Sequence, residues 1–536
     1  MTGLKNTAIR WIKIVHPISL IPFFYCSYIR KRRASRFAPV NPVYALIPCI
    51  IMLFIAGCTK NRISWEGTAS IGSCKTGEIK PAPEKSSVIL TGGGHNLWEN
   101  RDGFFFAWNR VNGDLDLQCD IEWIGKGSHE HRKAGWMVRQ DLSKDAAYAD
   151  AVIHGDGLIS LQYREKKGGP TLEVRPQIRA PVTLLLQRRG NVYSLSLSRK
   201  GEPFQPAGVA RVDLSDPVYA GLLVCSHDST TSESAMFSNV RFENPGPVPD
   251  TARVLESTLE VMELETRSRR IVLREKNHFE APNWSRDGSL LYYNSKGRIY
   301  TIPVPGGTLR MLDTGVLDAC NNDHGLSPDG AWLAVSNQTD AGSKIYVLPG
   351  SGGQPRLVTE KAPSYWHGWS PDGKTLAYCA ERGGEFDVYD IPAEGGQERR
   401  LTRESGLDDG PDYSPDGKFI FLNSERTGRM HIWRIGSDGS NPVQMTSDEA
   451  FCDWFPHPSP DGKWIVFLSY DGSVKGHPPE QIVRLRLMPA GGGPAETLAV
   501  LYGGQGTINV PSWSPDSRYF AFVSYSRVQR DSHAEK

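Results

Sequence analysis

The hydrophobic positions in the second half of the chain fall into short runs that recur at a regular interval. Each run, such as 374–379 or 386–391, alternates with Gly-Gly or Asp-Gly pairs that suit tight hairpin turns. A tetrapeptide, Ser-Pro-Asp-Gly or a close variant, marks every repeat and begins at Ser285, Ser327, Ser370, Ser414, Ser459 and Ser514. Successive serines lie 42, 43, 44, 45 and 55 residues apart. This period predicts one supersecondary unit copied several times.

Each full repeat holds four strand-like runs, so the pattern predicts the four-stranded blades of a β-propeller. The sixth repeat supplies only two strands, whereas residues 257–274 hold two strand-like runs ahead of the first repeat. Pairing these segments would complete a sixth blade and remove the exposed sheet edges of an open array. We therefore predict a six-bladed propeller over residues 250–527, closed by strands from 257–274.

Residues 86–244 show a different alternation, in which apolar and polar positions change places at every step. Leu115, Leu117 and Cys119 alternate with polar neighbours, which is the period of a half-buried strand. Further runs at short intervals predict a β-sandwich, so the fold class is all-β. Residues 58–85 have the composition of a polar tether.

The repeats resemble the TolB-like propeller family. The matching runs are Trp/Tyr-Ser-Pro-Asp-Gly at Trp369, Tyr413 and Trp513, together with Ile-Tyr at Ile345 and Ile-Trp at Ile432. The resemblance covers the propeller half of the chain. It implies a fold that serves as periplasmic protein partners, as regulatory domains of peptidases and as enzymes, so it predicts the fold more firmly than the function.

The preceding region, 86–244, resembles concanavalin A-like jelly rolls on the runs 134–140, 157–164 and 219–228. Such sandwiches often bind carbohydrate, with aromatic rings stacked on sugars and polar side chains on the hydroxyl groups. The resemblance therefore implies candidate ligand-binding residues, which are Trp136, Arg139, His154 and Tyr163. The alternative is that the tryptophans only pack the core.

The first 57 residues concentrate positive charge. The whole chain has 61 basic and 60 acidic residues, but residues 1–57 carry eight of the basic ones and no acidic one. Basic residues at 30–36 precede an apolar stretch that ends Ile-Ala-Gly-Cys58, as in a secretory signal peptide. The last four residues resemble a bacterial lipobox, which implies lipidation of Cys58 and a membrane-anchored protein of the bacterial envelope, facing the periplasm or at the outer membrane. An uncleaved anchor is the alternative.

Beyond the leader, the chain has a net charge of −7, which argues against a nucleic acid as the main partner. Blade geometry places the Ser-Pro-Asp-Gly turns on one face of the propeller, where proline, aspartate and glycine have structural roles. The other face carries the crossings between blades. Three crossing histidines, His324, His367 and His457, lie two or three places before a repeat serine, near the mouth of the central funnel.

Neutral imidazoles that converge in this way could hold a divalent transition metal. Without a metal, the same histidines and Asp409 are candidate general acids and bases. The structural alternative is that these residues only bind channel water. Further ligand-binding candidates on the crossings and loops of this face are Asp408, Asp409, Asp412, Gln505, Asn509, Arg382, Arg426 and His477.

These patterns predict a cell-envelope lipoprotein that binds a glycan or a protein partner through the crossing face of the propeller and through a carbohydrate-binding-type sandwich. The alternative is a propeller enzyme, of the lyase or hydrolase type, that acts on oligosaccharides in the central funnel.

Overall fold

The structure is a computed structural model that describes residues 63–84 and 86–530. This part of the chain is built from β-strands, with two short 3-10 helices, η1 (Asp250–Ala252) and η2 (Gln505–Thr507). Within it, no helix has the length and apolar character that crossing a bilayer requires. The predicted leader, 1–57, and Cys58 lie outside the described residues.

Residues 67–246 form two seven-stranded antiparallel sheets. The first sheet has the strand order β1 (Gly67–Ile71), β6 (Phe104–Val111), β15 (Val218–Cys225), β8 (Lys133–Arg139), β9 (Tyr148–His154), β10 (Ile159–Arg164) and β11 (Leu172–Val174). The second has the order β14 (Gln205–Arg211), β13 (Val192–Ser198), β12 (Thr183–Arg189), β7 (Asp114–Ile124), β16 (Asp228–Gly246), β3 (Val88–Gly94) and β2 (Glu78–Pro81). A small hairpin joins β4 (Leu97–Trp98) to β5 (Arg101–Asp102).

The core of these two sheets follows the alternation of the sequence. In β7, Leu115, Leu117 and Cys119 are fully buried, as the period of two predicts. Two strands, β1 and β2, lie in the segment that the sequence predicts to be a tether, and they pair with β6 and β3. Their mixed polar composition hides them from pattern analysis, because each is a short strand with mostly half-exposed or exposed residues.

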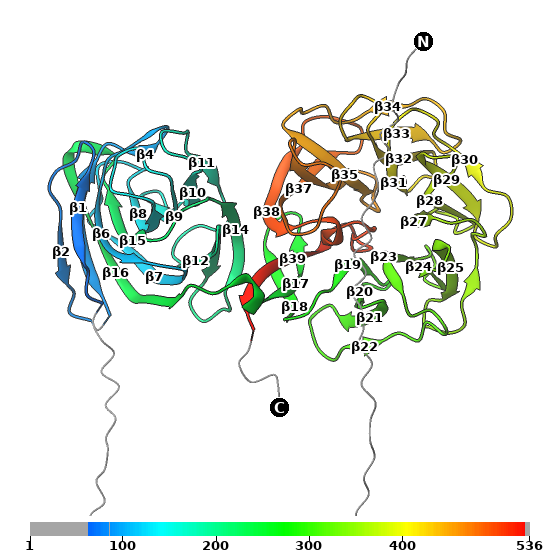
Figure 1. Cartoon of the computed structure of the whole chain (residues 1–536), viewed down its shortest axis with the longest axis horizontal. Helices are drawn as coiled ribbons and strands as arrows, with labels where there is room; N and C mark the ends of the chain where they lie inside the picture. The colour runs from blue at the N-terminus through cyan, green and yellow to red at the C-terminus, as the bar shows by residue number, and fades with distance from the viewer. Residues whose placement is uncertain (1–62, 85, 531–536) are drawn as a thin grey trace, which may run out of the picture. The chain divides into compact units, whose positions relative to one another are not determined.

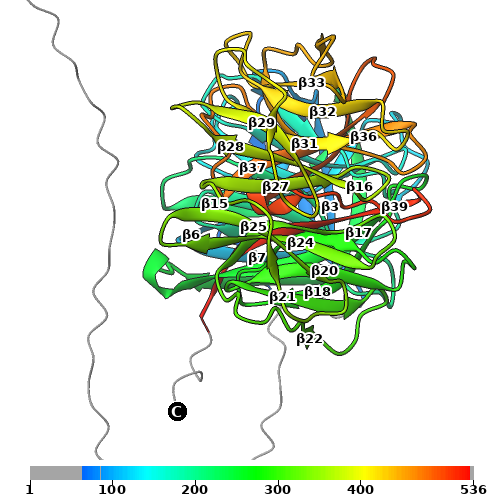
Figure 2. The same cartoon turned by 90° about the vertical axis from the view of Figure 1, so that its right-hand side faces the viewer.

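The propeller contains five four-stranded antiparallel sheets, each with its strands in sequence order (Figure 1). Blade 1 has β19 (Glu280–Trp284), β20 (Leu290–Ser295), β21 (Arg298–Pro303) and β22 (Arg310–Met311); blade 2 has β23 (Cys320–Leu326), β24 (Trp332–Thr339), β25 (Gly342–Pro349) and β26 (Arg356–Leu357). Blade 3 has β27 (Ser364–Trp369), β28 (Thr375–Glu381), β29 (Phe386–Pro392) and β30 (Arg399–Arg400); blade 4 has β31 (Asp408–Tyr413), β32 (Phe419–Ser424), β33 (His431–Gly436) and β34 (Val443–Gln444). Blade 5 has β35 (Phe451–Pro458), β36 (Trp464–Asp471), β37 (Gln481–Pro489) and β38 (Glu496–Gly503). Figure 2 shows blades 1 to 4 from the side as successive separate sheets.

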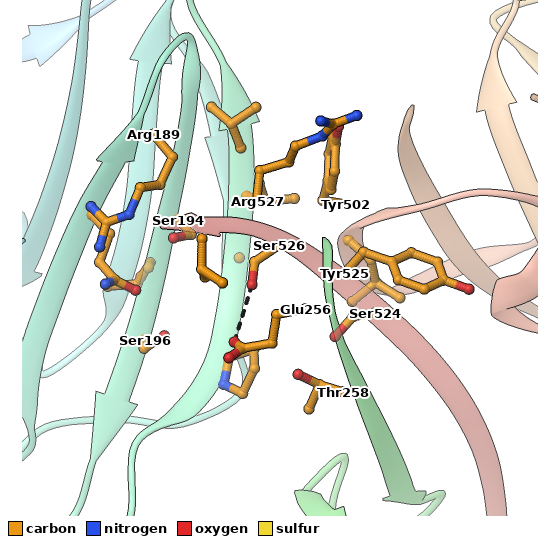
Figure 3. A pocket seen from close by; sticks show the side chains of 18 of the residues that line it. Arg189, Ser194, Ser196, Glu256, Thr258, Tyr502, Ser524, Tyr525, Ser526 and Arg527 are labelled. Atoms are coloured by element: carbon orange, nitrogen blue, oxygen red, sulfur yellow. Dashed lines mark hydrogen bonds between the residues drawn. The ribbon is translucent and has the colours of Figure 1, made fainter. Parts of the chain in front are cut away.

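The sixth blade joins the two ends of the propeller sequence. Its strands are β39 (Tyr519–Gln529), β17 (Arg253–Glu263) and β18 (Arg269–Glu275), and its inner strand is reduced to a bridge between Trp513 and Phe520. Inside this sheet, the buried carboxylate of Glu260 accepts hydrogen bonds from Arg269 (2.8 Å) and Ser524 (2.6 Å). Figure 3 shows a second link between the paired strands, in which the Ser526 hydroxyl donates to Glu256 (3.3 Å). The all-β fold with a six-bladed propeller is thereby confirmed.

Every repeat serine closes the same local network on the turn side of its blade. In blade 5, the Ser459 hydroxyl donates to Asp461 (2.6 Å) and accepts the backbone N–H of Trp464 (3.0 Å). The Asp461 carboxylate then accepts the N–H of Lys463 (3.1 Å). The same pair of serine bonds recurs in the other five repeats. These turns therefore satisfy their own polar groups, and the recurrence of the tetrapeptide reflects structure rather than chemistry.

The first repeat departs from the pattern, since Arg286 stands where the other repeats have proline. Its guanidinium donates to the backbone carbonyls of Leu326 (2.5 Å) and Ser327 (2.8 Å), so it ties blade 1 to the turn of blade 2. In the last repeat, Ser517 replaces glycine with a φ of 61°, and its hydroxyl accepts the N–H of Asp461 from blade 5 (3.0 Å). Both departures replace a local turn residue with a link between blades.

Candidate functional site

The inner strand of each complete blade changes its hydrogen-bond register ahead of the serine turn. In β31 the register shifts between Asp409 and Asp412, and similar shifts interrupt β19, β23, β27 and β35. Two non-glycine residues at these shifts, Ala281 in β19 and Phe455 in β35, have φ values of 58° and 55°. A bulge inserts an extra residue and turns the adjacent side chains in a new direction. On the crossing side of the blades, these bulges allow polar side chains to point toward the funnel.

A cavity of about 300 Å³ lies among these crossings. It is lined by residues of blades 2, 3 and 4, by the loop that follows β36 and by η2. Four of the predicted candidates line it: His367, Asp409, His477 and Gln505. The lining residues that the sequence did not single out are Asn321, Asn322, Asp323, Tyr365, Cys379, Phe386 and Leu407.

An ion pair between two buried side chains forms one wall of this cavity. Nε2 of His367 lies 3.0 Å from Oδ1 of Asp409. Burial opposes a charge on His367, but the Asp409 carboxylate outweighs it and raises the pKa of the imidazole to about 8. Burial also opposes the charge on Asp409, yet the His367 cation lowers the pKa of that carboxyl below its usual value. Among the described residues, Nδ1 of His367 has no hydrogen-bond partner, although the residue is only 3% exposed.

A second carboxylate lies in the same cavity and is held differently. Oδ1 of Asp323 accepts a hydrogen bond from the Asn509 amide (2.9 Å). Burial raises the pKa of Asp323 to about 6, and the nearby His367 cation opposes this shift while Asp409 adds to it. Oδ1 of Asn509 is itself buried and has no hydrogen-bond partner among the residues that the structure describes. The cavity thus combines a fixed ion pair, a carboxyl that titrates near neutral pH and unpartnered polar atoms.

The other two candidate histidines lie apart from this cavity. Both ring nitrogens of His457 contact the protein, Nδ1 with Asp412 (3.2 Å) and Nε2 with the carbonyl of Ile508 (2.8 Å). His324 is fully buried, its Nδ1 lies 3.1 Å from the Asn322 carbonyl, and burial lowers its pKa to about 4. Among the described residues there is no group of three or more histidine, cysteine or acidic side chains that could hold a metal ion. The geometry therefore gives the predicted metal site no support.

The two candidate arginines have carboxylate partners within the propeller. Arg382 pairs with Glu398 (2.9 Å), and Arg426 pairs with the buried Asp408 (3.1 Å). A guanidinium whose charge is already neutralised by a carboxylate attracts an anionic ligand more weakly.

The candidates of the sandwich are mostly enclosed. Trp136 is fully buried in the core between the two sheets. Arg139 is fully buried and donates to Asp102 (3.1 Å), and the imidazole of His154 contacts the Ser160 hydroxyl (3.1 Å). Burial lowers the pKa of His154 to about 3. Tyr163 in β10 is half-buried.

One simple signal would have found more of the cavity. Residues five places before a repeat serine occupy equivalent positions in successive blades. Four of them line this cavity or a second cavity beside it on the same face, namely Glu280, Asn322, Tyr365 and Asp409. Comparing the repeats column by column therefore identifies lining residues that no single motif reveals.

Comparison with known proteins matches the family model described as the TolB beta propeller domain to residues 360–483. A curated relative, "Uncharacterized protein Atu1656" of Agrobacterium fabrum, is 51% identical over 277 residues, which are 51% of this chain and 94% of that protein.

Two solved structures extend this comparison. The structure described as "putative TolB from Agrobacterium tumefaciens" is 50% identical, with a TM-score of 0.50, and the match covers 51% of this chain and 99% of that one. TolB from Acinetobacter baumannii is 16% identical, with a TM-score of 0.38, over 63% of this chain and 78% of that one.

Proposed function

This chain belongs to the TolB β-propeller family, and we propose that it is a binding protein of the bacterial cell envelope that holds a polypeptide partner on the crossing face of its propeller. The observation that carries the proposal is the contrast between the enclosed His367–Asp409 ion pair and the unpartnered Nδ1 of the same imidazole. Buried polar groups normally have partners. A ligand that accepts a hydrogen bond from Nδ1 would supply the missing partner.

The remaining walls of the cavity suit a polypeptide better than a small ion. Tyr365, Phe386 and Leu407 provide apolar surface beside the carboxylates of Asp323 and Asp409. Binding sites commonly combine apolar walls with a few convergent polar groups that fix orientation. A glycan, as the resemblance of the sandwich implies, is the other class of partner, and the experiment below separates the two.

A catalytic role is the second candidate, because a histidine paired with a carboxylate is a common general acid–base unit. With a pKa of about 8, His367 is protonated at neutral pH and would act as an acid rather than as a base. A lyase that abstracts a proton requires a base, which a protonated imidazole does not supply. The pair therefore favours binding over catalysis by proton abstraction.

The envelope location rests on the proposed lipidation of Cys58. Metabolic labelling with a palmitate analogue is expected to mark the full chain and to fail for Cys58→Ala. Labelling of the variant to the same extent would contradict lipid anchoring at this residue, while leaving the propeller proposal untouched.

Site-specific photocrosslinking tests the binding proposal. A benzoylphenylalanine at Gln505, on the crossing face, is compared in living cells with one at the exposed Asp372, in a serine turn. We expect a discrete polypeptide adduct from position 505 alone, which His367→Gln and Asp409→Asn weaken. A glycan array probed with the same protein covers the other class of partner. Equal adducts from both faces, or glycan binding without a polypeptide adduct, would contradict the proposal.

A further inference from the structure

A second cavity, of about 630 Å³, adjoins the first on the crossing face. The two cavities share Asn321, Asn322, Tyr365 and Gln505, so together they form one groove. The second cavity adds residues of the first, fifth and sixth blades, which no motif in the sequence indicated. Its size and its continuity with the first cavity suit an extended chain better than a compact ligand.

The carboxylate of Glu280 lies in this second cavity and, among the described residues, accepts no hydrogen bond. Its side chain is 19% exposed. The nearest basic group is Nε2 of His278, at 3.7 Å from Oε2, which exceeds hydrogen-bonding distance. Burial lowers the pKa of His278, which favours the uncharged form of this imidazole. The ring of His278 is held by stacking on Tyr525, with 5.7 Å between the ring centres.

The described lining of the groove contains acidic side chains but no lysine or arginine. The acidic residues are Glu280, Asp323, Asp409 and Glu480. Asp409 is paired with His367, and Glu480 accepts hydrogen bonds from Arg527 (2.8 Å). Asp323 lies near the His367 cation, which leaves Glu280, among the described residues, with only the His278 imidazole 3.7 Å away. Consistent with this, burial and the charge of Asp323 raise the pKa of Glu280 to about 7.

The wall opposite Glu280 is backbone rather than side chain. A Cβ atom built on Gly506 would lie 2.3 Å from Oε2 of Glu280 and 2.7 Å from the Tyr525 hydroxyl. The carboxylate therefore rests directly on η2, and a larger residue at position 506 would displace it. An incoming group meets Glu280 from the open side of the groove.

We propose that the groove binds an extended segment of the partner polypeptide and that a lysine or arginine of this segment places its cation against Glu280. This inference rests on the proposed function and names the chemistry of its ligand. A cation would form charge-assisted hydrogen bonds with a carboxylate that has already lost most of its water. It would also relieve the repulsion between Glu280 and Asp323.

Short capped peptides test the cation site directly. The probes are Ac-Gly-Lys-Gly-NH2 and Ac-Gly-Arg-Gly-NH2, with Ac-Gly-Nle-Gly-NH2 as the uncharged control, titrated by NMR at pH 8 against the soluble chain from residue 59 onward. Tighter binding of the cationic peptides by about tenfold is expected. Glu280→Gln should abolish this preference, and Gly506→Ala should reduce it by displacing Glu280. Glu394→Gln, which changes an 84% exposed carboxylate, is the matched control and should leave the preference intact.

Equal binding of the lysine and norleucine peptides, or a preference that survives in Glu280→Gln, would overturn the cation site. Such a result would leave the proposed function standing if position 505 still crosslinks to a polypeptide in cells. Loss of that adduct with a retained lysine preference would instead contradict the proposed function alone. Circular dichroism and thermal unfolding of each variant show whether it remains folded.

Discussion

The two ends of a propeller inner strand differ in how far their polar groups are hydrogen-bonded. At the turn end, a serine hydroxyl, an aspartate carboxylate and two backbone N–H groups satisfy one another in every repeat. At the crossing end, one buried polar atom in each of Asn283, His324, His367 and Asn509 has no hydrogen-bond partner within the part of the chain that the structure describes. Buried polar groups without partners lower the free energy of unfolding, so the crossing end reduces stability in a way that the turn end does not. The proposed function accounts for this difference, because a ligand would supply the missing partners at the crossing end, whereas the turn end needs none.

The largest expected effect comes from breaking the ion pair at the crossing end. Asp409→Ala leaves the buried His367 without its counter-ion and should lower the free energy of unfolding by about 3 to 5 kcal/mol at pH 6. The folded-state pKa of His367 is raised to about 8, so the stability it contributes is present below pH 6.5 and lost as the pH rises through 8. Urea unfolding at pH 6 and pH 9 should therefore show a larger difference from the parent at pH 6. A difference that does not vary with pH would contradict the charged pair.

Substitution of Glu280 is expected to change the free energy of unfolding in the opposite direction from Asp409→Ala. The pKa of Glu280 is raised from 4.5 to about 7, so the folded state holds this proton more tightly, and the stability it gives is lost as the pH rises through 7. Glu280→Gln should thus raise the free energy of unfolding by up to about 3 kcal/mol at pH 8 and change it little at pH 4.5. Thermal unfolding across this range checks the prediction, with Glu394→Gln as the exposed control. A variant that is destabilised at pH 8 would show that Glu280 has a stabilising partner.

A turn-end change should reduce stability without affecting binding. Ser459→Ala removes a buried hydroxyl and leaves the N–H of Trp464 without its partner, which should cost about 2 kcal/mol. Peptide binding in the groove should stay within twofold of the parent, because the turn lies on the other face of the blade. Ser351→Ala, at an exposed position, controls for the loss of a hydroxyl alone. Altered peptide affinity in Ser459→Ala would show that the two ends are coupled.

The difference between the two ends also explains what the sequence could predict. The turn end depends on local chemistry, so the repeated tetrapeptide is enough to count blades and to place strands. The crossing end depends on which groups meet across blades. Sequence placed His367 and Asp409 on this face, but only the fold shows that Arg382 and Arg426 are already paired with Glu398 and Asp408. Glu280 was not identified from the sequence because the segment before the first repeat serine has no histidine two or three places ahead of that serine.

The smallest expected effect tests whether the first turn differs from the others for a reason. Arg286→Pro restores the tetrapeptide found in four other repeats and removes the two hydrogen bonds to the carbonyls of Leu326 and Ser327. Proline fits this turn position in the neighbouring blades and should return about 0.4 to 1 kcal/mol by restricting the unfolded chain. The lost bonds from a charged donor outweigh that gain, so a net loss of about 1 kcal/mol is expected in urea unfolding. Arg286→Ala, which lacks the proline contribution, should lose more. Stabilisation by Arg286→Pro would mean that the link between blades 1 and 2 adds nothing to a ring already closed by β17 and β39.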